Sequence, residues 1–241
     1  HCYGNMCDTD SIDALANEHG LKVIYDACHS FGVQDGGGSV LRHGDISVVS
    51  FHATKVFNTF EGGLLVSPDA ATKQKVDRLK NFGFVDEISV TEPGLNGKMS
   101  EFNAAIGLLQ MRHFEIAISK RQSCDSLYRE LLKNTPGITC VEPVGQVVRN
   151  YSYFPVLLEP SSPLRRDELY ALLTSEGIYG RRYFYPLISD LPMYEAFPSA
   201  DPLRLPVARD ISSRVICLPL YSDLSPAEIE RICAVITAGL S

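Results

Sequence analysis

The sequence lacks any apolar run of the roughly 18 residues that a membrane-spanning helix needs, so we do not expect a transmembrane protein. It also lacks a long block of basic residues, because its lysines and arginines are scattered and the formal net charge is −7. A protein that binds nucleic acid usually presents a basic face, so we disfavour that class of function. No signal peptide is recognisable, and we therefore expect a cytoplasmic protein.

No C-x-x-C pair is present, and the seven cysteines form an odd set without regular spacing. We therefore expect reduced, mostly buried thiols, and we disfavour a disulfide framework or a zinc site. His43, His52 and His113 have no spacing that would place them on one face with a cysteine, which argues against a zinc enzyme. No G-x-G-x-x-G motif follows an apolar run, so a nicotinamide-dependent oxidoreductase is disfavoured.

What the sequence does contain is an ordinary globular composition, with 45% hydrophobic and 21% charged residues. The spacing of apolar residues predicts a helix over 11–19, and Gly20 is typical of a helix end. Short apolar runs predict buried strands over 21–25, 46–51 and 63–67. Such strands, separated by helices and loops, are typical of a mainly parallel α/β sheet.

The spacing of apolar residues changes after a long helical stretch over 102–133, which we expect to connect two domains. The segments that follow are short and mixed in type: strands over 138–141, 151–158 and 179–185, and helices over 166–176 and 226–238. Ser225 and Glu228 form a capping box at the start of the last helix. The sequence therefore predicts a large domain over 1–133 and a small α+β domain over 134–241.

Side chains suited to chemistry gather where the first two predicted strands end. Asp26 ends the first strand and His29 follows it, while Ser50 lies at the end of the second strand and Lys55 follows it. Functional groups in such sheets gather at the carboxyl edge of the strands, so we expect these four side chains to meet. Desolvation could make the Lys55 amine a nucleophile, and Asp26 could pair with a protonated pyridine nitrogen. Taken singly, each residue also fits a purely structural role.

Three stretches resemble one family and occur in its order: VIYDACHSFG, SVVSFHATKVFNTFEGGLLV and PGLNGKMSEFNAAIGLLQM. They resemble the DegT/DnrJ/EryC1/StrS nucleotide-sugar aminotransferases, which are fold-type-I enzymes dependent on pyridoxal 5′-phosphate (PLP). The resemblance continues through 151–155 and 182–187 to the last helix. It implies an α/β chain that holds the C-terminal part of this fold, with an incomplete large-domain sheet and a small α+β domain.

The resemblance also implies a role for each residue at the strand ends. Lys55 would form the covalent bond with PLP and then move the proton between cofactor and substrate carbons. Asp26 would pair with the pyridine nitrogen. His29 would lie near the phenolic oxygen of the ring, and Ser50 would contact the phosphate.

Further residues and partners follow from the same resemblance. Asn96 would reach the phosphate of the neighbouring subunit's cofactor, so the active site would be shared across a homodimer. Tyr183 and Tyr185 lie on the segment that lines the sugar pocket in the family. L-glutamate would donate the amino group, and a nucleotide-linked keto-deoxysugar, most similarly dTDP-4-keto-6-deoxyglucose, would accept it for surface polysaccharide synthesis.

Two alternatives remain open and a third is disfavoured. A 3-keto sugar could be the substrate instead. A related dehydratase is disfavoured, because those members replace the Schiff-base lysine with histidine and Lys55 is present here. The chain could also be a non-catalytic fragment that keeps the fold and the dimer surface only.

The sequence departs from the family pattern in two places. His1-Cys-Tyr-Gly matches a point inside the family's large domain, so the segment with the phosphate-binding Gly-Ser/Thr loop and the ring-stacking aromatic is missing. We therefore expect this chain alone to bind PLP weakly and to be inactive, with an exposed sheet edge that favours self-association. Ile188 stands where many members have a histidine.

Overall fold

The computed structural model of the chain describes residues 1–145 and 147–241 and divides into two compact units. The first unit comprises His1–Ile118 and Val144–Ser152, and the second comprises Ser119–Pro143 and Tyr153–Ser241. The first unit is therefore discontinuous in sequence. The expected division into domains between residues 133 and 134 stays a prediction.

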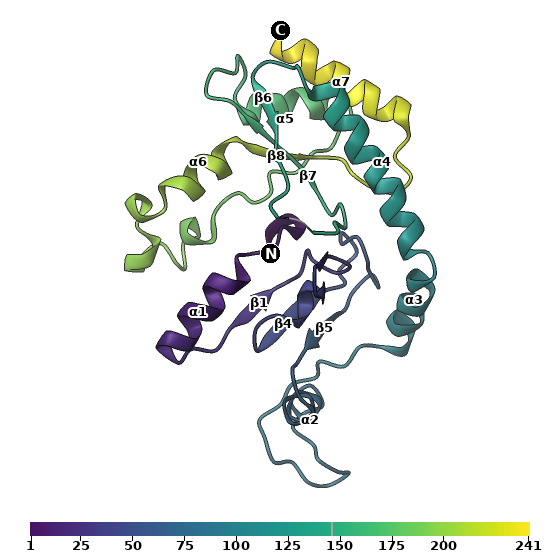
Figure 1. Cartoon of the computed structure of the whole chain (residues 1–241), viewed down its shortest axis with the longest axis vertical. Helices are drawn as coiled ribbons and strands as arrows, with labels where there is room; N and C mark the ends of the chain where they lie inside the picture. Colours follow the sequence, from purple (N-terminus) through teal and green to yellow (C-terminus); the bar gives the residue numbers. More distant parts are fainter. Residues whose placement is uncertain (146) are drawn as a thin grey trace. The chain divides into compact units, whose positions relative to one another are not determined.

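The first unit is built on a three-stranded sheet with the order β1-β4-β5 (Figure 1). β1 (Ile24–Asp26) and β4 (Ile46–Ser50) are parallel, whereas β4 and β5 (Gly63–Val66) are antiparallel. The expectation of a mainly parallel sheet is therefore wrong for one of the two strand pairs. Residues 51–62, all of them described, contain no helix that could carry the chain back to the start of a parallel strand, so β5 returns beside β4 in the opposite direction.

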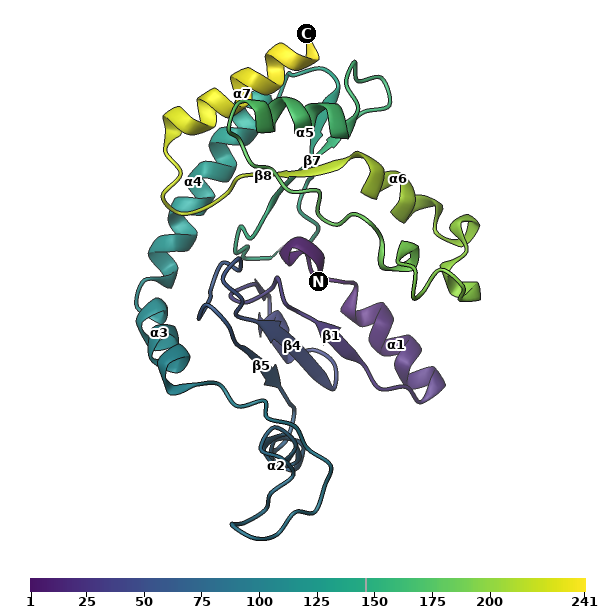
Figure 2. The same ribbon diagram turned by 180° about the vertical axis from the view of Figure 1, so that it is seen from behind.

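Helix α1 (Thr9–His19) lies beside β1 in both front and rear views (Figures 1 and 2). The Asp8 side chain accepts a hydrogen bond from the backbone N–H of Ser11, which caps the start of the helix. Gly20 ends the helix in the left-handed conformation, with a φ of 61°. This confirms the predicted helix and its glycine end. The unit also contains α2 (Ala70–Leu79), which the sequence analysis did not predict, and two short strands, β2 (Gln34–Asp35) and β3 (Gly38–Ser39).

The single long helix expected over 102–133 is wrong, because the structure has two helices there. α3 (Glu101–Met111) ends where the N–H groups of Arg112 and His113 bond to carbonyls three residues back. Such bonds tighten and close the last turn of a helix. α4 (Phe114–Leu132) then begins, and the boundary between the two compact units falls within it.

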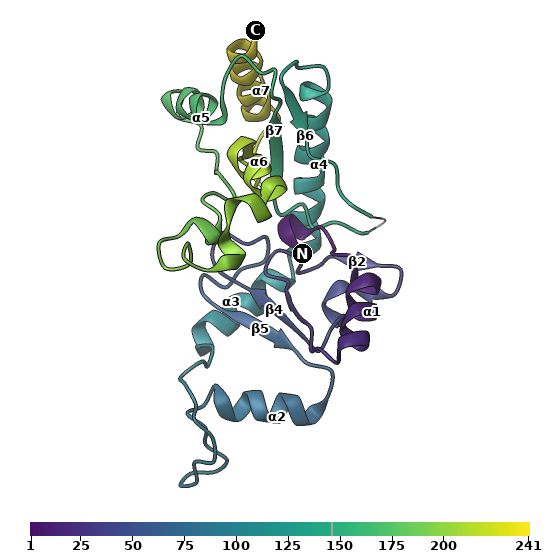
Figure 3. The same cartoon turned by 90° about the vertical axis from the view of Figure 1, so that its left-hand side faces the viewer.

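The second unit contains the antiparallel sheet β6-β7-β8, formed by Ile138–Cys140, Phe154–Leu158 and Val215–Leu218. Helices gather around this sheet (Figures 2 and 3): α4, α5 (Arg166–Ser175) and α7 (Pro226–Leu240), with α6 (Pro206–Arg214) leading into β8. The core takes apolar side chains from all three strands and from these three helices, among them Tyr128, Phe154, Leu169, Leu173, Ile216 and Ile236. The sequence therefore builds a small α+β layer, as predicted.

The strands of this unit differ from the sequence prediction in three ways. The expected strand over 179–185 is not formed, and only Arg181 makes an isolated bridge, to Cys217 of β8. β8 was not predicted, although its four residues are all buried and form the same kind of short apolar run as the strands predicted in the first unit. β7 begins at Phe154, later than expected, after Tyr151 adopts a φ of 50°.

The ends of α5 and α7 agree with the sequence. Gly177 follows α5 with a φ of 73°. Ser225 and Glu228 cap α7 reciprocally: the Ser225 side chain accepts from the Glu228 N–H, and the Glu228 side chain accepts from the Ser225 N–H at 2.8 Å. Within the part of the chain that the structure describes, no helix has the length and apolar character needed to cross a membrane.

We expect Leu173→Ala to lower the free energy of unfolding by about 2–5 kcal/mol, because it leaves a cavity among fully buried side chains. Leu203→Ala is the matched control, since Leu203 is 88% exposed. Its effect should stay within about 0.5 kcal/mol. Chemical denaturation followed by circular dichroism measures both variants, and equal losses would contradict this description of the core.

Candidate functional site

The pairing of β1 with β4 sets the position of the candidate site in the first unit. Asp26, the last residue of β1, lies opposite Val48, and the N–H of Ala27 donates to the Val48 carbonyl at 2.9 Å. Ser50 is the last residue of β4. Because parallel strands end at the same edge of a sheet, the loops that carry His29 and Lys55 begin side by side.

The electrostatics of Cys28 and His29 show that charged groups converge at this edge. The pKa of the Cys28 thiol is raised to about 11, mainly by burial and also by hydrogen bonding to Asp26, while the charge of Lys55 opposes the rise. His29 also responds to both Lys55 and Asp26. The structure therefore brings Asp26, His29 and Lys55 within electrostatic reach of one another around Cys28.

Asp26 is held as a carboxylate. Burial alone raises its pKa, but hydrogen bonds from the thiol and the backbone N–H of Cys28, together with the nearby His29, lower the pKa below its ordinary value. The N–H of Cys28 lies 3.1 Å from Oδ1 of Asp26. An anion fixed at the end of a strand can stabilise a cationic ligand group.

His29 is held as a neutral imidazole. Its pKa is lowered to about 4, mainly by burial and also by the positive charge of Lys55, while the negative charge of Asp26 opposes both effects. Its Nδ1 accepts a hydrogen bond from the backbone N–H of Tyr3 at 3.1 Å. The ring therefore stays uncharged at neutral pH.

Lys55 lies on a loop that is closed by its own hydrogen bonds. The N–H of Phe51 donates to the Gly62 carbonyl at 2.8 Å, and the N–H of Thr59 donates to the Phe51 carbonyl at 2.9 Å. Asn103 of α3 donates from Nδ2 to the Thr59 carbonyl at 2.6 Å. These bonds fix both ends of the segment on which the half-buried Lys55 lies.

The Gly-Gly pair after this loop is required by close packing. A Cβ on Gly63 would lie 2.6 Å from the Val49 carbonyl oxygen. Gly62 has a φ of 153° and would place its Cβ 2.5 Å from the Thr59 hydroxyl oxygen. Any side chain here would push β5 away from β4 or displace the lysine loop.

A cluster of aromatic side chains packs against the loop that carries Lys55. Phe51 and Phe57, which flank Lys55 in sequence, pack with Phe31 and Phe114 at ring-centroid distances of 4.5–6.0 Å. Edge and offset ring contacts of this kind stabilise a fixed arrangement. A lysine set between two anchored rings has its backbone position determined by packing as well as by hydrogen bonds.

The remaining predicted residues lie in different places. The Ser50 hydroxyl accepts a hydrogen bond from the His52 N–H at 3.3 Å. Asn96 is exposed and accepts from Nζ of Lys98 at 2.8 Å. Tyr183 and Tyr185 belong to the second unit, where Arg166 lies 4.3 Å from the centre of the Tyr185 ring. The roles assigned to these residues stay predictions.

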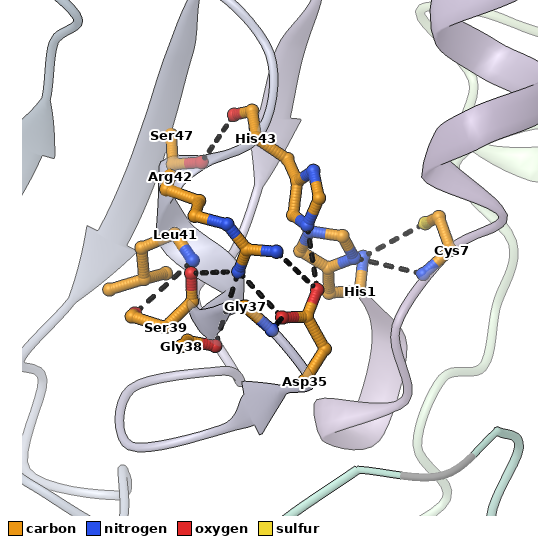
Figure 4. A network of polar contacts seen from close by, with 10 residues as sticks. All are labelled: His1, Cys7, Asp35, Gly37, Gly38, Ser39, Leu41, Arg42, His43 and Ser47. Carbon is orange, nitrogen blue, oxygen red and sulfur yellow. Dashed lines mark hydrogen bonds and ion pairs between the residues drawn. The ribbon is translucent and has the colours of Figure 1, made fainter.

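A second polar cluster in the first unit is structural rather than part of this site (Figure 4). Asp35 accepts hydrogen bonds from Arg42 at 2.8 Å, from Gly37 at 2.8 Å and from Nε2 of His43 at 2.8 Å. The Arg42 and His43 contacts hold the pKa of the Asp35 carboxyl far below its ordinary value. These three partners of the carboxylate lie on the β2–β3 turn and on the segment directly after it, so the cluster closes that hairpin.

A hollow of about 630 Å³ in the first unit does not coincide with the candidate site. It is lined by β4 and β5 on one side and by α2 and 97–99 on the other, and Asp26, His29 and Lys55 are not among its lining residues. Its walls include Val49, Leu64 and Leu65, so it is a largely apolar sheet face. The hollow is therefore separate from the candidate site at the edge of the sheet.

Several residues of the site were missed by sequence reasoning. Asn150 and Ser152 both donate to the carbonyl of His29, at 2.8 and 3.0 Å, across more than a hundred residues of sequence. Tyr3 donates its backbone N–H to the His29 ring, a contact that no side-chain pattern reveals. Cys28, which bonds to Asp26, was also missed. Its place in the sequence between Asp26 and His29, two predicted site residues, is the one signal that could have found it.

Two curated relatives are about half identical to the chain. The dTDP-4-amino-4,6-dideoxy-D-glucose transaminase of Shigella dysenteriae is 51% identical over 236 residues, which is 98% of this chain and 64% of that protein. The enzyme of the same name from Escherichia coli is 50% identical over 234 residues, 96% of this chain and 63% of that protein. The chain thus spans less than two thirds of the length of these relatives.

A solved structure has the same fold. DesI, crystallised in the presence of its TDP-sugar product, superposes with a TM-score of 0.92 at 33% identity. The match covers 99% of this chain and 60% of DesI. It confirms the predicted fold class, an α/β chain corresponding to part of a sugar aminotransferase.

The low pKa of His29 makes the free energy of unfolding depend on pH. Between pH 6.5 and about 4 the unfolded chain binds a proton at His29 that the folded chain does not, so the free energy of unfolding should fall as the pH is lowered. The contribution of His29 to this pH-dependent change in the free energy of unfolding is at most about 3 kcal/mol, and His29→Gln should remove it. Urea titrations at several pH values measure the difference, with His19→Gln on exposed α1 as control. Identical pH profiles for parent and His29→Gln would contradict the prediction.

The family assignment rests on nearly the whole chain. The model of one family, the DegT/DnrJ/EryC1/StrS aminotransferases, matches residues 1–237. The matched region includes both strand ends of the candidate site and the whole of the second unit's sheet. Together with the 51% identity to a curated relative, this match shows that the chain belongs to the DegT/DnrJ/EryC1/StrS aminotransferase family.

Proposed function

We propose that the complete gene product containing this chain is a PLP-dependent aminotransferase, which moves an amino group from L-glutamate to a nucleotide-linked keto-deoxysugar. The proposal rests mainly on the convergence of Lys55, Asp26 and His29 at the edge of the β1–β4 pair. The names of the two half-identical relatives favour dTDP-4-keto-6-deoxyglucose as the amino acceptor. A 3-keto sugar is the alternative substrate.

The residues present fit PLP by their chemistry. The carboxylate of Asp26, whose pKa is lowered, suits a protonated pyridine nitrogen. The neutral imidazole of His29 suits a ring oxygen, and the half-buried amine of Lys55 suits an aldehyde. Bound PLP would supply an electron sink for the substrate carbon that loses its proton.

The chain's own residues would bind the cofactor, transfer the proton and stabilise the charge on the pyridine ring. Lys55 would hold the cofactor through Nζ, and after release from it the same Nζ would take the proton from the substrate carbon and deliver it to the cofactor carbon. Asp26 would keep the positive charge on the pyridine nitrogen. Ser50, at the end of β4, would donate from its hydroxyl to the phosphate.

Two features support a homodimer with shared sites. Helix α3 exposes several large apolar side chains: Phe102, Leu108, Leu109 and Met111. The preceding segment exposes more of them, including Ile88 at 87%, and carries the exposed Asn96. A second copy of the chain would cover these side chains, and Asn96 would then lie close to the partner's site.

We expect Lys55→Ala in the complete gene product to abolish the long-wavelength absorbance of lysine-bound PLP and all amino transfer. Borohydride reduction followed by peptide mass mapping should find the cofactor on Lys55 in the parent protein. Lys75→Ala, an exposed lysine on α2, is the matched control and should keep both properties. Retention of the absorbance in Lys55→Ala would show that the lysine assignment is wrong.

The sharing of sites across the dimer has its own test. Lys55→Ala and Asn96→Ala subunits should each be nearly inactive alone. Mixed after dissociation and reassociation, they should recover about a quarter of parent activity, because half of the dimers carry one intact site of two. If Asn96 served the site of its own subunit, mixing would recover no activity.

A further inference from the structure

The backbone around His29 is held from two directions. On one side Asn150, which is 2% exposed, donates from Nδ2 to the carbonyls of His29 and Phe31 at 2.8 and 2.9 Å, and Ser152 donates its hydroxyl to the same His29 carbonyl. On the other side the N–H of Tyr3 reaches the imidazole itself. The ring position is thus determined before any ligand arrives.

The Tyr3 contact depends on an unusual turn. Tyr3 lies in the short 3-10 turn Cys2–Gly4 with φ 57° and ψ 10°, a left-handed conformation that is uncommon for a residue with a side chain. Gly4 follows with φ +86°, and a Cβ there would lie 2.8 Å from Oδ1 of Asn150 and 3.1 Å from the His29 carbonyl oxygen. Glycine therefore allows this turn to approach His29 closely enough for the hydrogen bond.

The direction of this hydrogen bond determines where the imidazole proton lies. A ring nitrogen that accepts an N–H carries no proton of its own, so a neutral His29 has its proton on Nε2. A protonated ring would place an N–H at Nδ1 against the N–H of Tyr3. Burial and the neighbouring charge of Lys55 also favour the neutral ring.

We propose that Tyr3 is a positioning residue whose backbone N–H fixes His29 as the Nε2-protonated tautomer, so that His29 acts on the ring oxygen of the cofactor as a hydrogen-bond donor. This inference rests on the proposed function for the identity of the ligand. In this arrangement His29 neither takes nor gives a proton during the reaction. Its donated hydrogen bond stabilises negative charge on the oxygen and leaves proton movement to Lys55.

The tautomer can be tested without any cofactor. Histidine-selective ¹⁵N labelling and long-range ¹H–¹⁵N correlation spectra distinguish a protonated Nε2 from a protonated Nδ1, and His29→Gln identifies the His29 signals. We expect the Nε2-protonated pattern, unchanged between pH 8 and pH 5. A protonated Nδ1, or a cationic ring at pH 7, would overturn the proposal. Because PLP is absent from this measurement, its outcome is independent of the proposed enzymatic activity.

The role of the turn is tested by Gly4→Ala, which should displace the Tyr3 N–H and give a mixture of the two tautomers. Gly36→Ala is the matched control, because a Cβ there meets no atom within 4 Å. If Gly4→Ala keeps the pure Nε2-protonated pattern, Tyr3 does not position the ring.

A third measurement tests the donor role toward the cofactor. His29→Gln can still accept from Tyr3 and donate from its amide, whereas His29→Glu can only accept. In the PLP-loaded complete protein, the pH at which the bound cofactor changes colour should rise by about one unit or more in His29→Glu, and stay near the parent value in His29→Gln. Equal shifts in both variants would show that no hydrogen bond is donated.

Discussion

The parallel register between β1 and β4 is the constraint on which the candidate site depends. Because Asp26 lies opposite Val48, the two strands end together, and the loops that leave them carry His29 and Lys55 into the same space. A change of one residue in this register would turn the Asp26 side chain to the other face of the sheet. The charge pattern around Cys28 is thus a consequence of strand pairing more than of any local motif.

The lysine loop shows how the side chain proposed to bind the cofactor, Lys55, is placed by residues that have no catalytic role in the proposal. Phe51 and Phe57 anchor the backbone on both sides of Lys55, and the glycine pair allows β5 to return directly against β4. Hydrogen bonds close the loop at both ends, and the aromatic packing holds the backbone between them. Sites built on such packed supports hold their geometry because moving the side chain would require repacking the core.

Much of this arrangement could be predicted from the sequence where the signal is local. The helix end at Gly20, the Ser225 capping box and the approximate positions of strands β1 and β4 all depend on neighbouring residues. The antiparallel return of β5, the break between α3 and α4, and the buried strand β8 depend on tertiary packing, which periodicity does not encode. The partners of His29 were unpredictable for the same reason, since Tyr3 acts through its backbone and Asn150 is distant in sequence.

The return of 144–152 to the first unit links the folding of the two parts of the chain. The chain leaves the first unit inside α4, forms β6, and only then supplies Asn150 and Ser152 to the His29 carbonyl. A nascent chain that ended at Ile118 would contain Asp26, His29 and Lys55. It would lack the two side chains that bond to the His29 carbonyl. Translation must therefore proceed well beyond α4 before this edge of the sheet can reach its final form, which ties the order of synthesis to the maturation of the site.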